Sequence, residues 1–185
     1  MVCIIKLVQG SLMKRLVTAA LSLGSLTSLA APLDAAVETS QGNAQQLARL
    51  WRKPTVLFYE DRDSNQLNQH VKDALFKAGR ERGLTEAVDV VAVANVKAYN
   101  WFPARNFVLS AVRDIEKQVH VPVYLDFTGS LAEAPWSLPP RSSTVLVLSA
   151  TGEPLWQKQG RLSAEALAEV FALLETLIAQ PTAQH

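Results

Sequence analysis

The chain has 185 residues and a formal net charge of +1 at neutral pH, from 18 Lys and Arg against 17 Asp and Glu. This balance gives no electrostatic footprint for nucleic acid, so we expect no nucleic-acid partner. A single cysteine, Cys3, stands at the far N-terminus.

The N-terminal segment is predicted to be a cleavable secretion signal over residues 1–30. Lys14 and Arg15 form a positive n-region, and an uncharged, largely apolar stretch follows over residues 16–29. Residues 28–30, Ser-Leu-Ala, place small side chains where a signal peptidase requires them. The stretch is too short to span a bilayer comfortably, so we expect no stable membrane anchor after cleavage. Met13 is predicted to be the translation start, with Met1 as the alternative.

Signal cleavage changes the charge and the redox chemistry of the chain. It removes Lys6, Lys14 and Arg15 but no acidic residue, so 15 Lys and Arg remain against 17 Asp and Glu, a formal charge of −2. It also removes Cys3, the only cysteine, so the exported form is predicted to contain no thiol.

The remaining 155 of the 185 residues suit one domain with its own core. Residues 31–46 are rich in Ala, Gln, Ser and Asn and are predicted to be a flexible lead-in. Residues 47–180 are predicted to form the single folded domain.

The elements of that domain alternate between helices and strands. The strands are compact apolar, β-favouring runs, and the helices carry apolar residues at helical spacing. In chain order the patterns predict a short helix at 45–51, a strand at 55–59, a helix at 65–82, a strand at 88–93, a helix at 104–119 and a strand at 121–125. The clearest helical period is that of Ala104, Phe107, Val108, Ala111, Val112 and Ile115.

A hairpin and a closing helix complete the chain. The apolar run at 144–148, the Thr151-Gly152 turn and the segment 154–159 predict two antiparallel strands. Ser163 is the predicted N-cap of a helix over 163–179. A strand–helix–strand half followed by a hairpin and a closing helix is the plan of the thioredoxin fold. The sequence therefore predicts an α/β fold of this type, a central mixed sheet flanked by helices.

The C-terminal third carries a family resemblance. Its residues are Ser142 to Leu148, Thr151-Gly152-Glu153, Trp156, Gly160 and Leu162 to Glu165. This pattern resembles the C-terminal signature of the YtfJ family, bacterial periplasmic proteins with a thioredoxin-like fold and no established activity. The resemblance covers residues 54–179, is strongest after Asn95, and implies a periplasmic location.

Redox relatives of this fold carry Cys-x-x-Cys at a helix start after the first strand, and a cis-proline before the hairpin strand. Aligning residues 56–59 with that strand places Asp63, Ser64, Asn65 and Gln66 at the cysteine motif and Ser143 at the proline. A carboxylate is no redox nucleophile. The fold is therefore predicted to lack both chemical marks of the redox enzymes.

Asp63 has a structural interpretation, as a helix N-cap with Gln66 completing a capping box. A calcium loop beginning at Asp61 is not expected, because the glycine at its sixth position and the glutamate at its twelfth are absent. His70, His120 and His185 are too scattered for a metal centre. No Gly-x-Ser-x-Gly motif marks a nucleophilic serine. We therefore expect no catalytic residue, metal or cofactor.

Three aromatic residues, Tyr99, Trp101 and Phe102, lie in one predicted loop, where they either line a binding surface or cover the end of the core. A candidate groove lies between residues 60–65, 99–103 and 141–143. Its candidate residues are Asp63, Ser64, Gln66, Tyr99, Trp101, Ser142 and Ser143.

Two hypotheses about function follow. The first is a non-catalytic module that binds a periplasmic protein or a small-molecule ligand through the candidate groove. The second is a cysteine-independent enzyme, or a redox-pathway protein of the peroxiredoxin and thioredoxin-like superfamily that borrows a partner's thiol. The missing thiol, metal cluster and nucleophile–base pair favour the first.

We predict that the exported protein begins near Ala31 and reacts with no thiol reagent. Intact mass spectrometry of the periplasmic form, with and without iodoacetamide, measures both properties. A mass that retains Cys3 would contradict the prediction.

Overall fold

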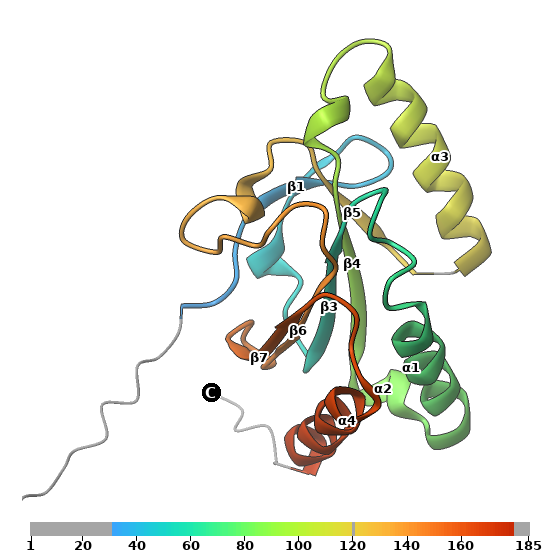
Figure 1. The fold of residues 1–185 in the computed structure, drawn as a ribbon, viewed down its shortest axis with the longest axis vertical. Coiled ribbons are helices and arrows are strands. Elements are labelled where there is room, and N and C mark those ends of the chain that lie inside the picture. Colours follow the sequence, from blue (N-terminus) through green and yellow to red (C-terminus); the bar gives the residue numbers. More distant parts are fainter. Residues whose placement is uncertain (1–30, 120, 180–185) are drawn as a thin grey trace, which may run out of the picture.

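The computed structural model describes residues 31–119 and 121–179, so the predicted signal segment, with Met13 and Cys3, lies outside the described residues. A seven-stranded sheet has the order β2-β1-β5-β4-β3-β6-β7 (Figure 1). The strands are β1 (Ala36–Glu38), β2 (Ala44–Gln46), β3 (Thr55–Glu60), β4 (Asp89–Asn95), β5 (Val123–Asp126), β6 (Thr144–Leu148) and β7 (Pro154–Gln159). The helices are α1 (Gln69–Arg82), α2 (Leu84–Ala87), α3 (Ala104–Val119) and α4 (Ala164–Ala179), with single 3-10 turns at Leu47–Arg49, Lys97–Tyr99 and Ser130–Ala132.

The centre of the sheet is β3, in which all six residues are buried. It pairs in parallel with β4 and antiparallel with β6, so that Leu57 lies between Val91 and Leu146. β4 pairs in parallel with β5, and β6 forms the antiparallel hairpin with β7. The predicted mixed sheet is therefore confirmed, with the segment predicted at 121–125 inside it.

Side chains alternate between the two faces of the sheet, and each face has its own core. Leu57 and Tyr59 face a core completed by the N-terminal segment and by Leu131 and Leu138 of the β5–β6 connection. Val56 and Phe58 face the opposite core, which α1 and α4 cover. Figure 1 shows α1, α3 and α4 arranged around the lower and right-hand sides of the sheet in that view.

The prediction of a flexible lead-in at residues 31–46 is wrong. This segment forms β1 and β2, and β1 pairs with β5 at Glu38 and Leu125. Leu33 is fully buried, and the indole Nε1 of Trp51 donates a hydrogen bond of 2.7 Å to its carbonyl oxygen. Without β1, β5 would be an edge strand with unpaired backbone groups, so this pairing satisfies a need that composition does not reveal.

Two further boundaries differ from the prediction. The expected short helix at 45–51 is instead β2 and a 3-10 turn at Leu47–Arg49. α1 begins at Gln69 rather than near residue 65, because residues 62–68 form successive turns first. It ends as predicted, at Gly83, whose positive φ of 68° suits glycine.

α3 has the predicted bounds, but several of the apolar side chains that predicted it are exposed to solvent. Val112 is 8% exposed, whereas Phe107 is 71% and Ile115 is 47% exposed. α4 also has the predicted position, and the Ser163 hydroxyl accepts a hydrogen bond of 3.3 Å from the Ala166 amide, as an N-cap does. No helix in the described part of the chain is long and apolar enough to cross a membrane.

We predict that Leu33→Ala destabilises the protein by about 3 kcal/mol, because it removes a fully buried side chain and leaves a cavity. Gln41→Ala, in the exposed β1–β2 turn, is the matched control and should change stability by less than about 0.5 kcal/mol. Urea denaturation of both variants measures the difference. Equal stability would show that residues 31–46 do not contribute to the fold.

Candidate functional site

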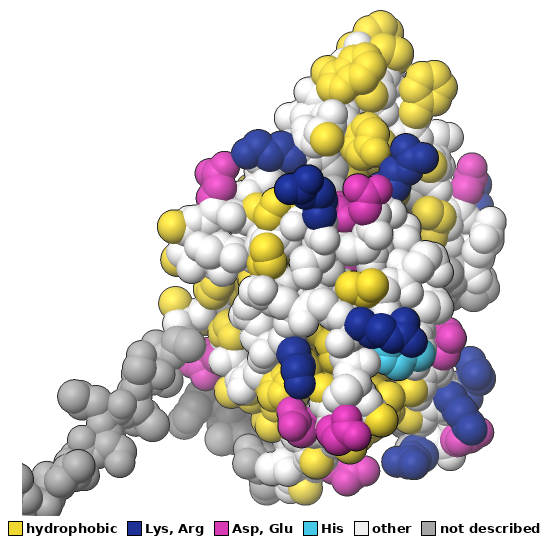
Figure 2. Space-filling model, viewed as in Figure 1, with side chains coloured by type: hydrophobic (Ala, Val, Ile, Leu, Met, Phe, Trp, Pro, Cys, Tyr) yellow, Lys and Arg dark blue, Asp and Glu magenta, His cyan; other side chains and the backbone are white. Residues whose placement is uncertain are grey.

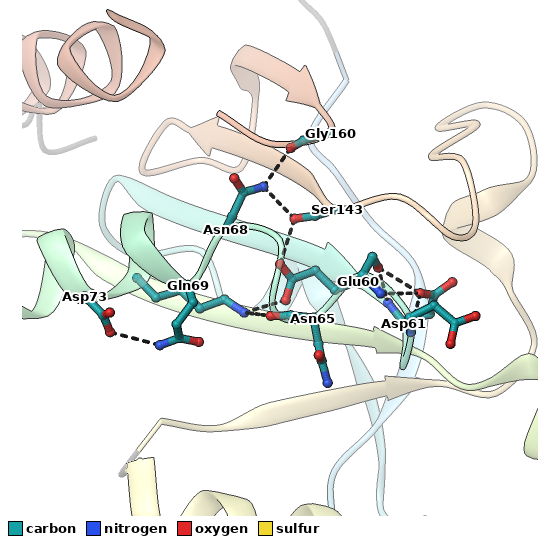
Figure 3. A network of polar contacts seen from close by, with 11 residues as sticks. Glu60, Asp61, Asn65, Asn68, Gln69, Asp73, Ser143 and Gly160 are labelled. Atoms are coloured by element: carbon teal, nitrogen blue, oxygen red, sulfur yellow. Dashed lines mark hydrogen bonds and ion pairs between the residues drawn. The ribbon is translucent and has the colours of Figure 1, made fainter. Parts of the chain in front are cut away.

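A polar network lies where β3 ends, at the carboxyl edge of the parallel strands (Figure 3). Its centre is Glu60, the last residue of β3, which is only 7% exposed. Lys72 of α1 places its ammonium group 2.6 Å from Glu60 Oε2. The Ser143 hydroxyl donates a hydrogen bond of 2.7 Å to Oε1. Both carboxylate oxygens therefore have a partner inside the protein.

Asn68 joins this network to the C-terminal half of the chain. Its side-chain amide nitrogen donates to Ser143 Oγ and to the Gly160 carbonyl, both at 2.8 Å. Its amide oxygen accepts a hydrogen bond of 2.8 Å from the Leu162 backbone. Asn68 is fully buried, so each of these bonds replaces water that the fold has excluded. Figure 3 shows Asn68 pointing toward Ser143 and Gly160.

The prediction that Asp63 caps the helix is wrong, because α1 begins only at Gln69 and it is Asp61 that accepts the backbone amides of the turns before it. Asp61 Oδ1 accepts hydrogen bonds from the backbone amides of Asp63 and Ser64, each 3.1 Å, and Oδ2 accepts one of 2.6 Å from the Arg141 amide. Asp63 is exposed, and so is Gln66. The capping box is absent because α1 starts after the turns, with Asn68 at its N-cap position and no side-chain cap bond.

Lys72 is held from three sides. Besides the pair with Glu60, its ammonium group donates to the Asn65 carbonyl at 2.9 Å and lies 5.3 Å from the centre of the Phe58 ring. A cation over an aromatic face is attracted by the ring quadrupole. The network is thus internally satisfied, and this arrangement favours a structural role over acid–base chemistry.

Glu60, Asn68 and Lys72 are not among the candidate residues predicted from the sequence. One sequence feature could have indicated the network: Glu60 is a charged residue at the end of a largely apolar strand. A buried charge of this kind requires an oppositely charged or hydrogen-bonding partner. Asn68 and Lys72 are four residues apart, at the N-cap and in the first turn of α1, where they point to the same side of the helix.

A second polar pair anchors the β5–β6 connection on the other face. The Tyr59 hydroxyl donates a hydrogen bond of 3.2 Å to Asp126 Oδ2. Burial, reinforced by the Asp126 carboxylate, raises the pKa of Tyr59 well above its ordinary value, so the phenol stays neutral. Asp126 also accepts hydrogen bonds from the Gly129 and Leu131 amides, at 2.7 and 3.1 Å.

An open groove of about 780 Å³ lies beside the Glu60 network, between α1 and α3. Gln66, Tyr99 and Trp101, three of the candidate residues, line it together with Glu60 and Lys72. Trp101 is 60% exposed. Figure 2 shows the hydrophobic side chains gathered at the tip of the molecule, over the loop that leads into α3.

The other candidate residues lie apart from the groove lining. Ser143 and Ser64 are buried, the first in the Glu60 network and the second hydrogen-bonded to Asp61 Oδ1 at 2.8 Å. Ser142 is half-buried, and Asp63 is exposed in the turns after β3. Tertiary structure therefore divides the candidate set between a closed polar network and an open groove.

Within residues 31–119 and 121–179, no three His, Cys, Asp or Glu side chains gather in a group that could hold a metal ion. His70 Nε2 lies 3.0 Å from the Leu162 carbonyl oxygen. His120 and His185 lie outside the described residues.

Solved structures with this architecture are thioredoxin-like. A putative thioredoxin from Neisseria meningitidis superposes with a TM-score of 0.56 at 16% identity, covering 83% of this chain and 93% of that one. A putative thiol:disulfide interchange protein DsbE from Chlorobium tepidum gives 0.54 at 16% identity, covering 78% and 94%. The exposed lipoprotein thioredoxin Etrx1 from Streptococcus pneumoniae gives 0.53 at 16% identity, covering 78% and 100%.

These similarities show the fold, and with only one cysteine in the chain it is a thioredoxin-like fold without Cys-x-x-Cys. The chain belongs to the YtfJ_HI0045 family, described as a bacterial protein of unknown function, whose model matches residues 62–177. The resemblance to this family is thus confirmed. No curated protein sequence matches the chain.

We predict that Lys72→Met destabilises the fold by about 3 kcal/mol, because it leaves the buried Glu60 carboxylate without its cation. The double variant Glu60→Gln with Lys72→Met should recover much of that loss, since no buried charge remains. Thermal and urea unfolding measure both.

The matched control is Lys97→Met, which breaks an ion pair with Glu133 whose side chains are 57% and 66% exposed. This change should cost less than about 1 kcal/mol. A Lys72→Met variant as stable as this control would show that the Glu60 network contributes little.

Proposed function

We propose that this protein is an exported, periplasmic thioredoxin-like module that binds a partner protein or a small-molecule ligand and catalyses no reaction. The binding surface is the groove beside the carboxyl edge of β3 and β4, with Tyr99 and Trp101 in its wall.

One observation carries the proposal. In redox members of this fold the segment after the first strand presents a reactive thiolate, whereas here the corresponding segment follows a closed Glu60–Lys72–Ser143 network. Its polar atoms are already partnered, so they offer little to a reacting substrate. The adjacent groove, by contrast, has exposed aromatic and apolar walls, as binding surfaces do.

Export is supported by the N-terminal pattern of Lys14 and Arg15, an apolar stretch and a Ser-Leu-Ala cleavage site. The exported form is also compatible with an oxidising compartment, because a protein without cysteines cannot form unwanted disulfides there. The periplasm is therefore the compartment in which we expect the binding partner.

We predict that the exported protein captures its partner from periplasmic extract and that Trp101→Ser with Phe107→Ser abolishes the capture. Both side chains line the groove and are mainly exposed, so the changes should leave folding intact. Leu155→Ser, an exposed apolar residue on β7 at the far edge of the sheet, is the matched control and should bind as the unmodified protein does.

Redox assays test the competing hypothesis. The exported protein should neither reduce insulin disulfides nor consume peroxide, because enzymes of this fold carry out both reactions with a cysteine thiolate. Turnover in either assay would contradict the non-catalytic proposal. Capture that Leu155→Ser weakens as much as the groove variant does would contradict the placement of the binding surface.

A further inference from the structure

The groove is a hollow over β4 that no side chain fills. Its floor is Val90, Ala92 and Ala94, which point to the α1 side of the sheet because they pair with Val56, Phe58 and Glu60. Alanine side chains are short, so the space above them stays open. The groove volume of about 780 Å³ lies in the range of small-molecule sites.

α3 is anchored by contacts on the side that faces β1 and the β1–β2 turn, and a stripe of apolar side chains on its groove side stays exposed. Arg105 pairs with Glu38 of β1 and lies 4.0 Å from the centre of the Phe127 ring. Arg113 donates to the Ser40 carbonyl at 2.9 Å. The opposite stripe consists of Phe107, Ala111 and Ile115, which follow one another at four-residue spacing, line the groove and are exposed.

Polarity changes along the length of the groove. The end at the carboxyl edge of the strands carries the polar lining residues, among them Arg62, Asn65, Gln66 and Asn95. The opposite end is apolar and is lined by Phe76, Val90, Ile115, Val121 and Val123. An amphipathic helix carries its polar and apolar residues on opposite faces along its whole length. A groove that is polar at one end and apolar at the other matches instead a molecule with a polar head and an apolar tail.

The charges at the polar end indicate the sign of the head group. The Glu60 carboxylate is paired with Lys72, and the Asp61 carboxylate is turned toward backbone amides. Arg62 is exposed and makes no ion pair with another described residue. The Arg62 guanidinium is cationic at neutral pH, and hydrogen bonding to Tyr99 together with the nearby Asp63 carboxylate raises its pKa further. A guanidinium is well suited to bind a carboxylate.

The length of the groove sets the length of the tail. Val90 to Asn95 spans about 17 Å along β4, and Ala104 to Ile115 spans about 16 Å along α3. Carbon–carbon bonds of about 1.5 Å at tetrahedral angles advance about 1.25 Å each, so an extended chain of about 13 bonds fills this length.

We propose that the groove between α1 and α3 binds a monomeric long-chain fatty acid, with its carboxylate at Arg62 and its alkyl tail over Ala92 between Phe76 and Phe107. This inference rests on the proposed function, because it names the ligand class of the same groove. The exposed apolar residues of α3 are then the wall of a lipid-binding site.

Calorimetric titration with myristate, below its micelle concentration, tests the inference on the exported protein freed of co-purified lipid. Myristate should bind with a stoichiometry of one. 1-Tetradecanol should bind about tenfold more weakly, and tetradecyltrimethylammonium more weakly still, because neither can pair with Arg62.

Two variants separate the head from the tail. Arg62→Gln should weaken myristate about tenfold and leave tetradecanol unchanged. Phe107→Ser with Ile115→Ser, both exposed, should weaken both ligands by the same factor of about ten or more. Leu155→Ser is the control and should bind both ligands normally.

Several results would overturn the inference. The first two are an absence of saturable myristate binding and an equal affinity for the cationic amphiphile. The third is binding of the protein to anionic vesicles without binding of monomeric myristate. The fourth is a dimer in sedimentation that the Phe107→Ser with Ile115→Ser variant does not form. If myristate fails while the Trp101 and Phe107 changes still abolish partner capture, the inference is wrong and the proposed function stands. If the protein turns over disulfides or peroxide, the proposed function fails whatever myristate does.

Discussion

The buried carboxylate of Glu60 is the constraint on which the arrangement of this edge of the molecule depends. β3 is buried on both faces, and its last side chain carries a charge that the interior cannot hold alone. Lys72 supplies the opposite charge at one carboxylate oxygen, and the Ser143 hydroxyl donates a hydrogen bond to the other. Asn68 then fixes the serine hydroxyl and fastens the start of α1 to the segment before α4. One buried charge thus ties β3 and the start of α1 to the residues that lead into β6 and α4.

At the same edge, this chain differs from the redox enzymes that share its fold. A redox enzyme of this fold keeps a reactive thiolate at the start of the helix after its first strand. This chain has turns at the corresponding place, with Asp61 accepting their backbone amides. These polar groups find their partners within the protein. The open surface at this edge lies beside these turns, in the groove between α1 and α3.

The groove results from two separate features of the chain. Small residues on β4, Ala92 and Ala94, keep the floor low. The Arg105–Glu38 ion pair and the hydrogen bond from Arg113 to the Ser40 carbonyl hold α3 toward β1 and the turn after it. Each feature alone has an ordinary structural interpretation. Together they leave the exposed side chains of Phe107 and Ile115 facing the groove.

From β3 onward the order of the strands and helices was predictable from the sequence, as were the thioredoxin-like plan, the missing Cys-x-x-Cys and the family resemblance. The N-terminal strands β1 and β2 were not. Periodicity reports burial within one element, so β3, α3, the 144–159 hairpin and α4 were predictable. Which residues meet depends on tertiary packing. Asn68 and Ser143 are 75 positions apart, Glu60 and Ser143 are 83 apart, and no local pattern joins them. The N-terminal strands and the exposure of Phe107 were likewise decided by packing, because a segment's own pattern does not say what lies on the other side of it.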